Sequence, residues 1–399
     1  MSAPPPGGLR GGVLHAVHGW PLDQLGGVGV VVDALCAAEA AAGRPVAVLA
    51  PSGGWRWRPR ARWQEGLPPV LFVDRGGGLG ARASWEQPAA LDAVGAALER
   101  LAPAALHVHH LAGLPLGLPA LARRMGLRVR ITLHDYHFVC PRGQLLDARG
   151  APCPGPAPDR CAGCLGLRGP TGPAAVRARR EVVSAQLAGA TVESPSADLA
   201  ERFERFGLPR PTVCALPPPA WTAAPRPATR QEAPLRALFL GALHPSKGPD
   251  LLLEAALRLP RGALDLRLAG PDGPDRAFVQ RIRGAVEEAR AAGRAVRLDG
   301  ALPRAEVPAA LAGADLLVVP SRWAENSPLV VREAMAAGLR TLVPAWGGAR
   351  ELDAGALVFG APRREPPRGP ARDQVIVAAI EAELRRALFG GSGDHTDMK

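Results

Sequence analysis

Short runs of valine and leucine alternate with alanine-rich amphipathic stretches from residue 12 onward. Apolar runs without polar alternation are typical of parallel strands buried on both faces, and amphipathic stretches are typical of the helices that cover such strands. The first half of the chain therefore predicts an α/β domain. Its predicted strands are GVLHAV, PVAVLA, PVLFVD, AALHVH, RVRITLH and ATVES, and its predicted helices lie near residues 29–42, 88–101, 173–188 and 197–206.

A proline-rich stretch, LPPPAWTAAPRPATRQEAP, interrupts this alternation, and the pattern then restarts. Its composition predicts a semi-rigid linker over residues 217–234, between an N-terminal domain (1–216) and a C-terminal domain (235–372). The predicted elements of the second domain are the strands LRALFLG, LDLRLAG, AVRLDG, ADLLVVP and RTLVPA, helices over residues 247–259 and 275–292, a short helix between AVRLDG and ADLLVVP, and a helix after ADLLVVP. A final helix over residues 373–389 could suit either domain, including packing back on the N-terminal one, and residues 390–399 are expected to be disordered.

Composition supports two domains and reduces the classes of binding partner to consider. The chain has 399 residues, more than one ordinary domain uses, and 47% of them are apolar. The net charge is +11, but Lys247 and Lys399 are the only lysines, so the excess is carried by arginine. These arginines are scattered and do not form a stripe interleaved with aromatic residues, so nucleic acid is not expected as a partner.

The start of the chain has no signal-peptide core, and no run approaches the ~20 apolar residues that a membrane-spanning helix needs. These features predict a cytoplasmic protein. Arginine-rich helical stretches such as VRARREVV leave open a peripheral contact with the inner face of the membrane.

Histidines gather at the ends of predicted strands. In open α/β sheets, ligands bind beyond the carboxyl ends of the strands, so these side chains are candidates for a site. The alternative is that they are ordinary polar residues at strand ends. The histidines in these positions are His15, His18, His107, His109, His110, His134, His137 and His244.

The stretch WAENSPLVVREAMAAG carries the strongest chemical signal. Asn326, the only asparagine, or Ser327 is expected to cap a helix whose first residue is Pro328 and which Gly338 terminates. Glu325 then lies in the loop before the helix. The free backbone N–H groups of residues 327–330 would offer a binding site to phosphate or to hydroxyl groups.

A second glutamate, Glu333, lies on the second turn of this helix. Carboxylates accept hydrogen bonds from hydroxyl groups and repel phosphate, whereas the helix N-terminus attracts phosphate. A nucleotide-sugar has both an anionic diphosphate and many hydroxyls, so it satisfies the whole arrangement. The alternative is two solvated glutamates beside a well-capped helix.

Four motifs in order resemble glycosyltransferase family 4, whose members are retaining, nucleotide-sugar-dependent enzymes. The stretch PSRWAENSPLVVREAMAAGLRTLVPAWGGARE resembles the family's E-x7-E motif. The other three, in chain order, are GGVGVVVDALCAAEAAAGRPVAVLAP, ALHVHHLAGLP and LRALFLGALHPSKGPDLLLEAAL. The resemblance implies a GT-B fold, in which two Rossmann-like, doubly wound parallel-sheet domains face a central cleft. It also implies transfer of a hexose-type sugar from a nucleotide-sugar to an acceptor hydroxyl.

The resemblance also implies roles for particular residues. Glu325 would contact the hydroxyls of the transferred sugar, Glu333 the ribose, and Lys247 the diphosphate of the leaving group. His109, the second histidine of the His-x-His motif, would lie beside the reacting carbon, which makes it the favoured choice over His107 and His110. The remaining donor contacts would come from the backbone of Gly26, Gly27, Asn326, Ser327, Pro328 and Leu329.

One departure concerns the cations. Where the family commonly has an arginine, five residues before Lys247, this chain has Ala242, so His244 or Arg322 would have to substitute or the diphosphate would be held less strongly. The implied mechanism is front-face attack with retention, in which the acceptor proton passes to the departing phosphate. No protein nucleophile and no catalytic metal or other cofactor is expected.

Residues 140–172 form a turn-rich insert with four cysteines, Cys140, Cys153, Cys161 and Cys164. In a cytoplasmic chain this set favours a structural zinc ion, with an iron–sulfur cluster, reduced thiols or disulfides as alternatives. The insert follows the ITLHDYHF strand end, on the side of the fold that binds the acceptor. We therefore expect it to shape the acceptor pocket.

Two classes of function stay open beside the glycosyltransferase. One is another GT-B activity, such as a sugar-phosphate synthase or a phosphorylase. The other is a non-catalytic protein that binds nucleotide-sugars or nucleic acid, for which the charge of +11 is the only support. The sequence names neither the base, nor the sugar, nor the acceptor, which could be a glycan, a glycolipid or a small molecule.

Overall fold

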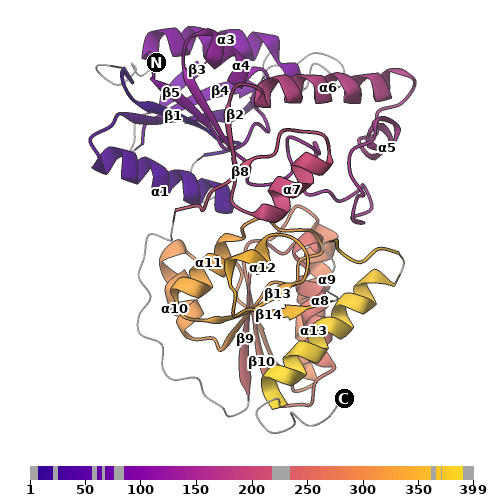
Figure 1. The fold of residues 1–399 in the computed structure, drawn as a ribbon. Helices are drawn as coiled ribbons and strands as arrows, with labels where there is room; N and C mark the ends of the chain where they lie inside the picture. The colour runs from indigo at the N-terminus through magenta and orange to yellow at the C-terminus, as the bar shows by residue number, and fades with distance from the viewer. Residues whose placement is uncertain are drawn as a thin grey trace, which may run out of the picture. The chain divides into compact units, whose positions relative to one another are not determined.

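A computed structural model describes residues 8–20, 26–55, 61–64, 68–75, 85–217, 234–360, 365–369 and 371–389. The chain divides into two compact units, residues 1–148 with 153–217 and residues 149–152 with 218–399 (Figure 1). Residues 218–233 of the predicted linker and the predicted disordered tail, residues 390–399, lie outside the described residues.

The first unit is built on an eight-stranded sheet in the order β3-β4-β2-β1-β5-β6-β7-β8. All its neighbouring strands are parallel except β3 and β4, which are antiparallel. The strand order reverses between β1 and β5, where an open parallel sheet has its ligand crevice. The strands are β1 (Val13–Ala16), β2 (Val46–Trp55), β3 (Ala61–Gln64), β4 (Val70–Arg75), β5 (Ala105–Val108), β6 (Arg128–Thr132), β7 (Thr191–Ser194) and β8 (Thr212–Val213).

The helices of the first unit follow the amphipathic stretches. All four predicted helices are present, at α1 (Gly27–Ala41), α3 (Pro88–Leu101), α6 (Thr171–Leu187) and α7 (Ala197–Arg205). Two short helices were not predicted, α4 (Leu118–Arg124) and α5 (Pro158–Cys164). Each has only seven residues, too few for a helical period to be read with certainty. Buried apolar residues of α1, β2 and β4, including Val32, Val48 and Val70, pack into one core cluster.

The second unit has a six-stranded sheet in the order β11-β10-β9-β12-β13-β14, with every neighbouring pair parallel. This is a doubly wound arrangement whose order reverses between β9 and β12. The strands are β9 (Leu235–Leu240), β10 (Leu264–Ala269), β11 (Ala295–Leu298), β12 (Leu316–Val318), β13 (Arg340–Pro344) and β14 (Leu357–Phe359). The helices are α8 (Pro249–Leu257), α9 (Arg276–Ala291), α10 (Val307–Ala312), α11 (Leu329–Ala336), α12 (Ala349–Leu352) and α13 (Arg372–Phe389), with 3₁₀ turns η2 (Pro245–Lys247) and η3 (Arg304–Glu306).

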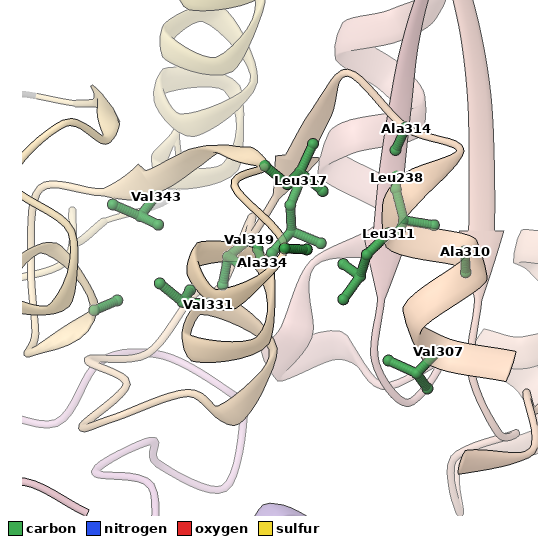
Figure 2. Packing of buried hydrophobic residues seen from close by; sticks show 13 residues of the cluster. Leu238, Val307, Ala310, Leu311, Ala314, Leu317, Val319, Val331, Ala334 and Val343 are labelled. Atoms are coloured by element: carbon green, nitrogen blue, oxygen red, sulfur yellow. The ribbon is translucent and has the colours of Figure 1, made fainter. Parts of the chain in front are cut away.

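One core cluster anchors α11, the helix of the E-x7-E stretch. Val331 and Ala334 on α11 are fully buried and belong to the same cluster as Leu317 of β12 and Val343 of β13 (Figure 2). Burial of each valine or leucine side chain contributes roughly 1.5–3 kcal/mol. The helix is therefore held to the sheet by its apolar face, which fixes where its N-terminus and Glu333 lie.

The final helix, α13, packs against α8 and β14 of the second unit. Its buried face is formed by Ile376, Val377, Ile380 and Leu384, and Gln374 Oε1 accepts a hydrogen bond from Arg258 Nη2 at 2.6 Å. The sequence left its packing partner open, and these contacts favour the second unit over packing on the N-terminal domain. No helix in the described ranges is long and apolar enough to cross a membrane.

Candidate functional site

The helix of the E-x7-E stretch begins one residue later than predicted. Pro328 is extended, with ψ 122°, so it precedes the helix and Leu329 is its first residue. The prediction that Asn326 or Ser327 caps the helix and that Pro328 opens it is therefore wrong. The N-cap residue, Pro328, has no hydrogen-bonding side chain and makes no capping hydrogen bond to the first backbone N–H groups of the helix.

The predicted end of this helix is confirmed. Gly338 has φ 63°, a left-handed conformation that suits glycine. Its N–H donates to the carbonyl of Met335 at 2.9 Å, and the N–H of Leu339 donates to the carbonyl of Ala334 at 2.8 Å. This Schellman arrangement satisfies the last carbonyls of the helix.

Glu325 is 4% exposed, and one of its two carboxylate oxygens is surrounded by donors. Oε1 accepts hydrogen bonds from Lys247 Nζ at 2.7 Å, Ser321 Oγ at 2.6 Å and Trp323 Nε1 at 3.1 Å. The hydrogen bonds that the structure describes for this carboxylate all end on Oε1, and none of them ends on Oε2. The arrangement holds a carboxylate in place by one oxygen and leaves the other for a hydroxyl group of a ligand.

Lys247 lies in the 3₁₀ turn η2, not in a helix as predicted, because Gly248 (φ 70°) separates it from the first residue of α8. Its ammonium group lies 5.5 Å from the centre of the Trp323 ring, a cation–π contact. The side chain is 32% exposed. An ammonium group has three N–H donors, so contact with Glu325 leaves donors for an anion that arrives from solvent.

Two glycines allow close approaches to the loop that carries Glu325. A Cβ atom on Gly248 would lie 2.0 Å from the carbonyl oxygen of Pro320, and one on Gly347 (φ 78°) would lie 2.6 Å from that of Glu325. The N–H of Gly348 donates to the carbonyl of Glu325 at 2.7 Å. The loop therefore packs closely against the backbone at Gly248 and at Gly347, and a side chain at either position would clash with it.

Arg322 does not take the place of the arginine missing at Ala242. It donates to Asp250 at 2.8 and 2.6 Å and to Asp373 at 3.0 and 3.0 Å, and also to the carbonyl of Pro245 at 2.7 Å. Burial disfavours its charge, but these carboxylates outweigh that and raise the pKa of Arg322. The arginine joins η2, α8 and α13, and it positions the segment that carries Lys247.

His244, the other candidate substitute, is a neutral group. Its Nδ1 accepts from the N–H of Ser246 at 3.1 Å, which assigns the proton to Nε2. Burial, followed by the charge of Lys247, lowers the pKa of His244. His244 can thus donate a hydrogen bond through Nε2 but adds no positive charge at pH 7.

Glu333 is buried and forms an ion pair with Nη1 of Arg304, whose side chain is 43% exposed. Burial raises the pKa of Glu333, and the arginine offsets only part of this effect. No local pattern pointed to Arg304, because it reaches α11 from the 3₁₀ turn η3, almost thirty residues upstream of Glu333. The two glutamates therefore differ: one is paired with a lysine and the other with an arginine.

Of the candidates in the first unit, Gly26 is the exposed N-cap of α1 and Gly27 its first residue. No side chain in the described part of the chain caps α1, and a Cβ atom on Gly26 would meet nothing within 4 Å. The loop before it, residues 21–25, lies outside the described residues. The open N-terminus of a fifteen-residue helix suits an anion.

The histidines at the carboxyl edge of the first sheet form two groups. In the first, His109 is 1% exposed, and its Nε2 lies 3.0 Å from His15 Nδ1 while its Nδ1 lies 3.0 Å from His134 Nε2. His107 Nε2 lies 2.8 Å from the Thr132 hydroxyl. Burial, with added repulsion from neighbouring positive groups, lowers the pKa of His107 to about 2 and that of His109 well below its usual value.

The second group contains a carboxylate that the sequence reasoning missed. His110 Nε2 lies 3.2 Å from Asp135 Oδ2, and the centre of the His110 ring lies 4.4 Å from that of His18 and 4.3 Å from that of His137, both in tilted contacts. Burial alone would raise the pKa of Asp135, but His110 and His137 lower it to about 2. The position of Asp135 in LHDYH, directly after a strand and between two histidines, was the available signal.

The four cysteines of the insert carry free thiols. In the part of the chain that the structure describes, the group of potential metal ligands whose donor atoms lie within 4.8 Å of one another is His15, His107 and His109, and it includes none of the cysteines. Burial raises the pKa values of Cys140 and Cys164, which disfavours their thiolates. The zinc site at the cysteines stays a prediction.

Two family models match consecutive parts of the chain. Residues 26–219 match the glycosyl transferase 4-like domain, and residues 223–354 match the glycosyl transferases group 1 domain. A curated relative, D-inositol 3-phosphate glycosyltransferase 1 of Catenulispora acidiphila, is 32% identical over 171 residues, which are 40% of this chain and 39% of that protein. The chain thus spans about two fifths of the length of this relative.

Solved structures support the fold. Sucrose-phosphate synthase from Thermosynechococcus elongatus is similar with a TM-score of 0.63 at 18% identity, over 96% of this chain and 94% of that one. The Anabaena protein HepE in complex with UDP-glucose has a TM-score of 0.58 at 14% identity, over 94% of this chain and 95% of that one. The predicted GT-B fold, with two Rossmann-like α/β domains, is confirmed.

Proposed function

Because the chain belongs to glycosyltransferase family 4, we propose that it transfers a hexose-type sugar from a nucleotide-diphosphate sugar to an acceptor hydroxyl. The second unit provides the groups that such a donor requires: a fixed carboxylate, a lysine and a helix start whose N-cap residue is a proline. The observation that carries the proposal is the Lys247–Glu325 contact at 2.7 Å, which leaves Glu325 Oε2 available.

Each part of the donor would bind the groups that suit its chemistry. The diphosphate would meet Lys247 and the backbone N–H groups at the start of α11, from Asn326 to Leu329. Glu325 Oε2 would accept a sugar hydroxyl, and Glu333, steadied by Arg304, the ribose hydroxyls. The HepE protein, which shares this fold, binds UDP and UDP-glucose, so uracil nucleotides are the first donors to test.

Catalysis would rest on charge and position. When the bond between sugar and diphosphate breaks, negative charge grows on the leaving oxygen, and a fixed ammonium group there stabilises the transition state. The acceptor hydroxyl would attack from the same face and give its proton to the departing phosphate, so the configuration at the anomeric carbon is retained. We assign His109 to the acceptor side, beside the reacting carbon, by family resemblance.

This chain would hold its donor with a single cation. Arg322 is committed to two aspartates, and His244 is a neutral donor through Nε2. The loss of one diphosphate ion pair corresponds to roughly 1.5–3 kcal/mol of binding free energy. We therefore expect a weaker affinity for nucleoside diphosphates than a site with two cations would have.

The acceptor would be a hydroxyl of a phosphorylated small molecule or of a glycan or glycolipid. Several matched proteins carry names with phosphorylated partners, namely D-inositol 3-phosphate glycosyltransferases and sucrose-phosphate synthase. Sugar phosphates and inositol phosphates therefore stand first in the acceptor panel. The cysteine insert beside the first sheet would shape this pocket, and a cytoplasmic location with peripheral membrane contact stays a prediction.

The test begins with thermal shifts against a panel of nucleotide-sugars, followed by mass analysis of products with candidate acceptors. Glu325→Gln should keep binding of the nucleoside diphosphate and lose transfer. The exposed Glu287 of α9 supplies the matched control, since Glu287→Gln removes the same charge far from the loop. Tight donor binding by the wild-type protein without transfer to any acceptor would instead favour a non-catalytic binder.

A further inference from the structure

Three histidines converge on one face of the first sheet. His15 on β1 and His107 on β5 are paired in register on adjacent parallel strands, so their side chains emerge side by side. His109 follows two residues after His107, just past the end of β5, and two-residue spacing returns to the same face. Donor nitrogens of all three lie within 4.8 Å of one another.

Two of these rings, those of His107 and His109, each have one nitrogen in contact with a residue outside the trio. The Thr132 hydroxyl lies 2.8 Å from His107 Nε2, and His134 Nε2 lies 3.0 Å from His109 Nδ1. Such contacts fix the orientation of the rings, as the outer hydrogen bonds of metal-binding histidines do. They leave His107 Nδ1 and His109 Nε2 as the nitrogens that can face the third ring.

The third ring is incompletely satisfied. His15 is 1% exposed, its Nδ1 lies 3.0 Å from His109 Nε2, and its Nε2 has no hydrogen-bond partner among the residues that the structure describes. A buried polar group without a partner costs roughly 1–3 kcal/mol. Direct contacts between imidazoles in a dry site are weak compensation for three desolvated rings.

We propose that His15, His107 and His109 form a binding site for a divalent transition metal ion, with zinc the best fit. Zinc accepts three imidazole nitrogens and keeps a fourth position for water or another oxygen ligand. The site shares His109 with the proposed transferase site and is separate from the cysteines, and zinc stoichiometry measured without donor or acceptor tests it independently of sugar transfer.

The first experiment measures metal stoichiometry. The full chain, purified without a histidine tag, is stripped with a chelator and dialysed against buffered Zn²⁺, in a Cys161→Ser/Cys164→Ser background that disables the insert. We expect one tightly bound zinc ion per chain. No bound zinc in this background would overturn the proposal.

Substitutions then assign the ligands. His15→Leu and His107→Leu should each weaken zinc binding by more than about 100-fold, since loss of an outer partner alone costs 10–100-fold. His18→Leu is the matched control, because it removes a half-buried histidine near the same edge and should leave affinity unchanged. Unchanged affinity in both ligand variants would refute the assignment.

Two further measurements distinguish loss of a zinc ligand from misfolding of a variant. Thr132→Val is nearly isosteric and removes only the hydrogen bond to His107, so we expect zinc affinity to fall about 10–100-fold with an unchanged melting temperature. Co²⁺ bound to the wild-type chain should show visible d–d bands without a thiolate charge-transfer band. A spectrum dominated by thiolate charge transfer would place the metal at the cysteines and contradict the proposal.

Discussion

Replacement of Lys247 by methionine removes the ammonium group and keeps most of the side chain's volume. In the wild-type protein this group donates to Glu325 at 2.7 Å, and Glu325 is 4% exposed. The change therefore leaves a buried carboxylate with Ser321 and Trp323 as its remaining donors. Two effects follow, one on stability and one on ligand binding, and they can be separated.

The stability effect is limited because Lys247 is 32% exposed. A hydrogen bond to a charged group contributes about 1.5–3 kcal/mol, and solvent screening at this exposure places the loss near ~1–2 kcal/mol. For a domain of this size that lowers the melting temperature by roughly 2–8 °C. A second change, Glu325→Gln, should recover most of the loss, since the amide oxygen still accepts from Ser321 and Trp323 and no buried charge remains.

The binding effect should not recover. Loss of the charge-assisted contact to the diphosphate weakens binding of a nucleoside diphosphate by about 10–100-fold, and loss of one fixed donor to the leaving group lowers kcat by about 10²–10³. Isothermal titration of UDP, or of whichever nucleotide the donor panel selects, measures the first quantity. If the double variant regains wild-type affinity for the nucleotide, Lys247 is only the structural partner of Glu325 and the reasoning is refuted.

Three further predictions concern stability. Arg322→Gln should destabilise the second unit by about 2 kcal/mol, less than a fully buried pair because its aspartates are partly exposed, and calorimetry showing no change would contradict its structural role. Gly347→Ala should lower the free energy of unfolding by more than about 2 kcal/mol. The control Gly338→Ala should lower it by about 1 kcal/mol, because Gly338 has positive φ but open space around it. Equal losses in denaturant titrations would count against the close approach at Gly347. Because the folded-state pKa values of His15 and His107 lie near 4 and 2, below 6.5 in the unfolded chain, each contributes stability that is present above pH 6.5 and declines by up to ~1.4 kcal/mol per unit as pH falls. Melting temperatures of the zinc-free chain should therefore drop between pH 7 and pH 5, and a flat profile would argue against the buried neutral histidines.

Local patterns in the sequence predicted much of the fold. Buried parallel strands leave continuous apolar runs, and glycine at a helix end leaves a local signature, so β5, β10 and the stop at Gly338 could all be identified. Boundaries that depend on one dihedral angle were missed. The 3₁₀ turn at Lys247 ends at Gly248, whose backbone lies against Pro320, a residue distant in the sequence, and the extended conformation of Pro328 is a single dihedral angle that the sequence pattern does not contain.

The partners of the site residues were harder to predict than the residues themselves. Arg322 has a side chain that can bind phosphate, but Asp250 and Asp373 pair with it from two helices that are distant in the sequence. The strand-end rule gathered the histidines at one edge, yet it could not tell which rings would pair. That depends on the register of β1 with β5, which no local pattern contains.

The most direct test of the proposed function is the configuration of the transferred sugar, read by NMR from the product that the wild-type chain forms with a nucleotide-sugar and the acceptor panel. We predict release of the nucleoside diphosphate together with a glycosidic bond of the same anomeric configuration as the donor, and loss of both in Lys247→Met and Glu325→Gln. A product of inverted configuration, or full transfer by both variants, would contradict the assignment of this site.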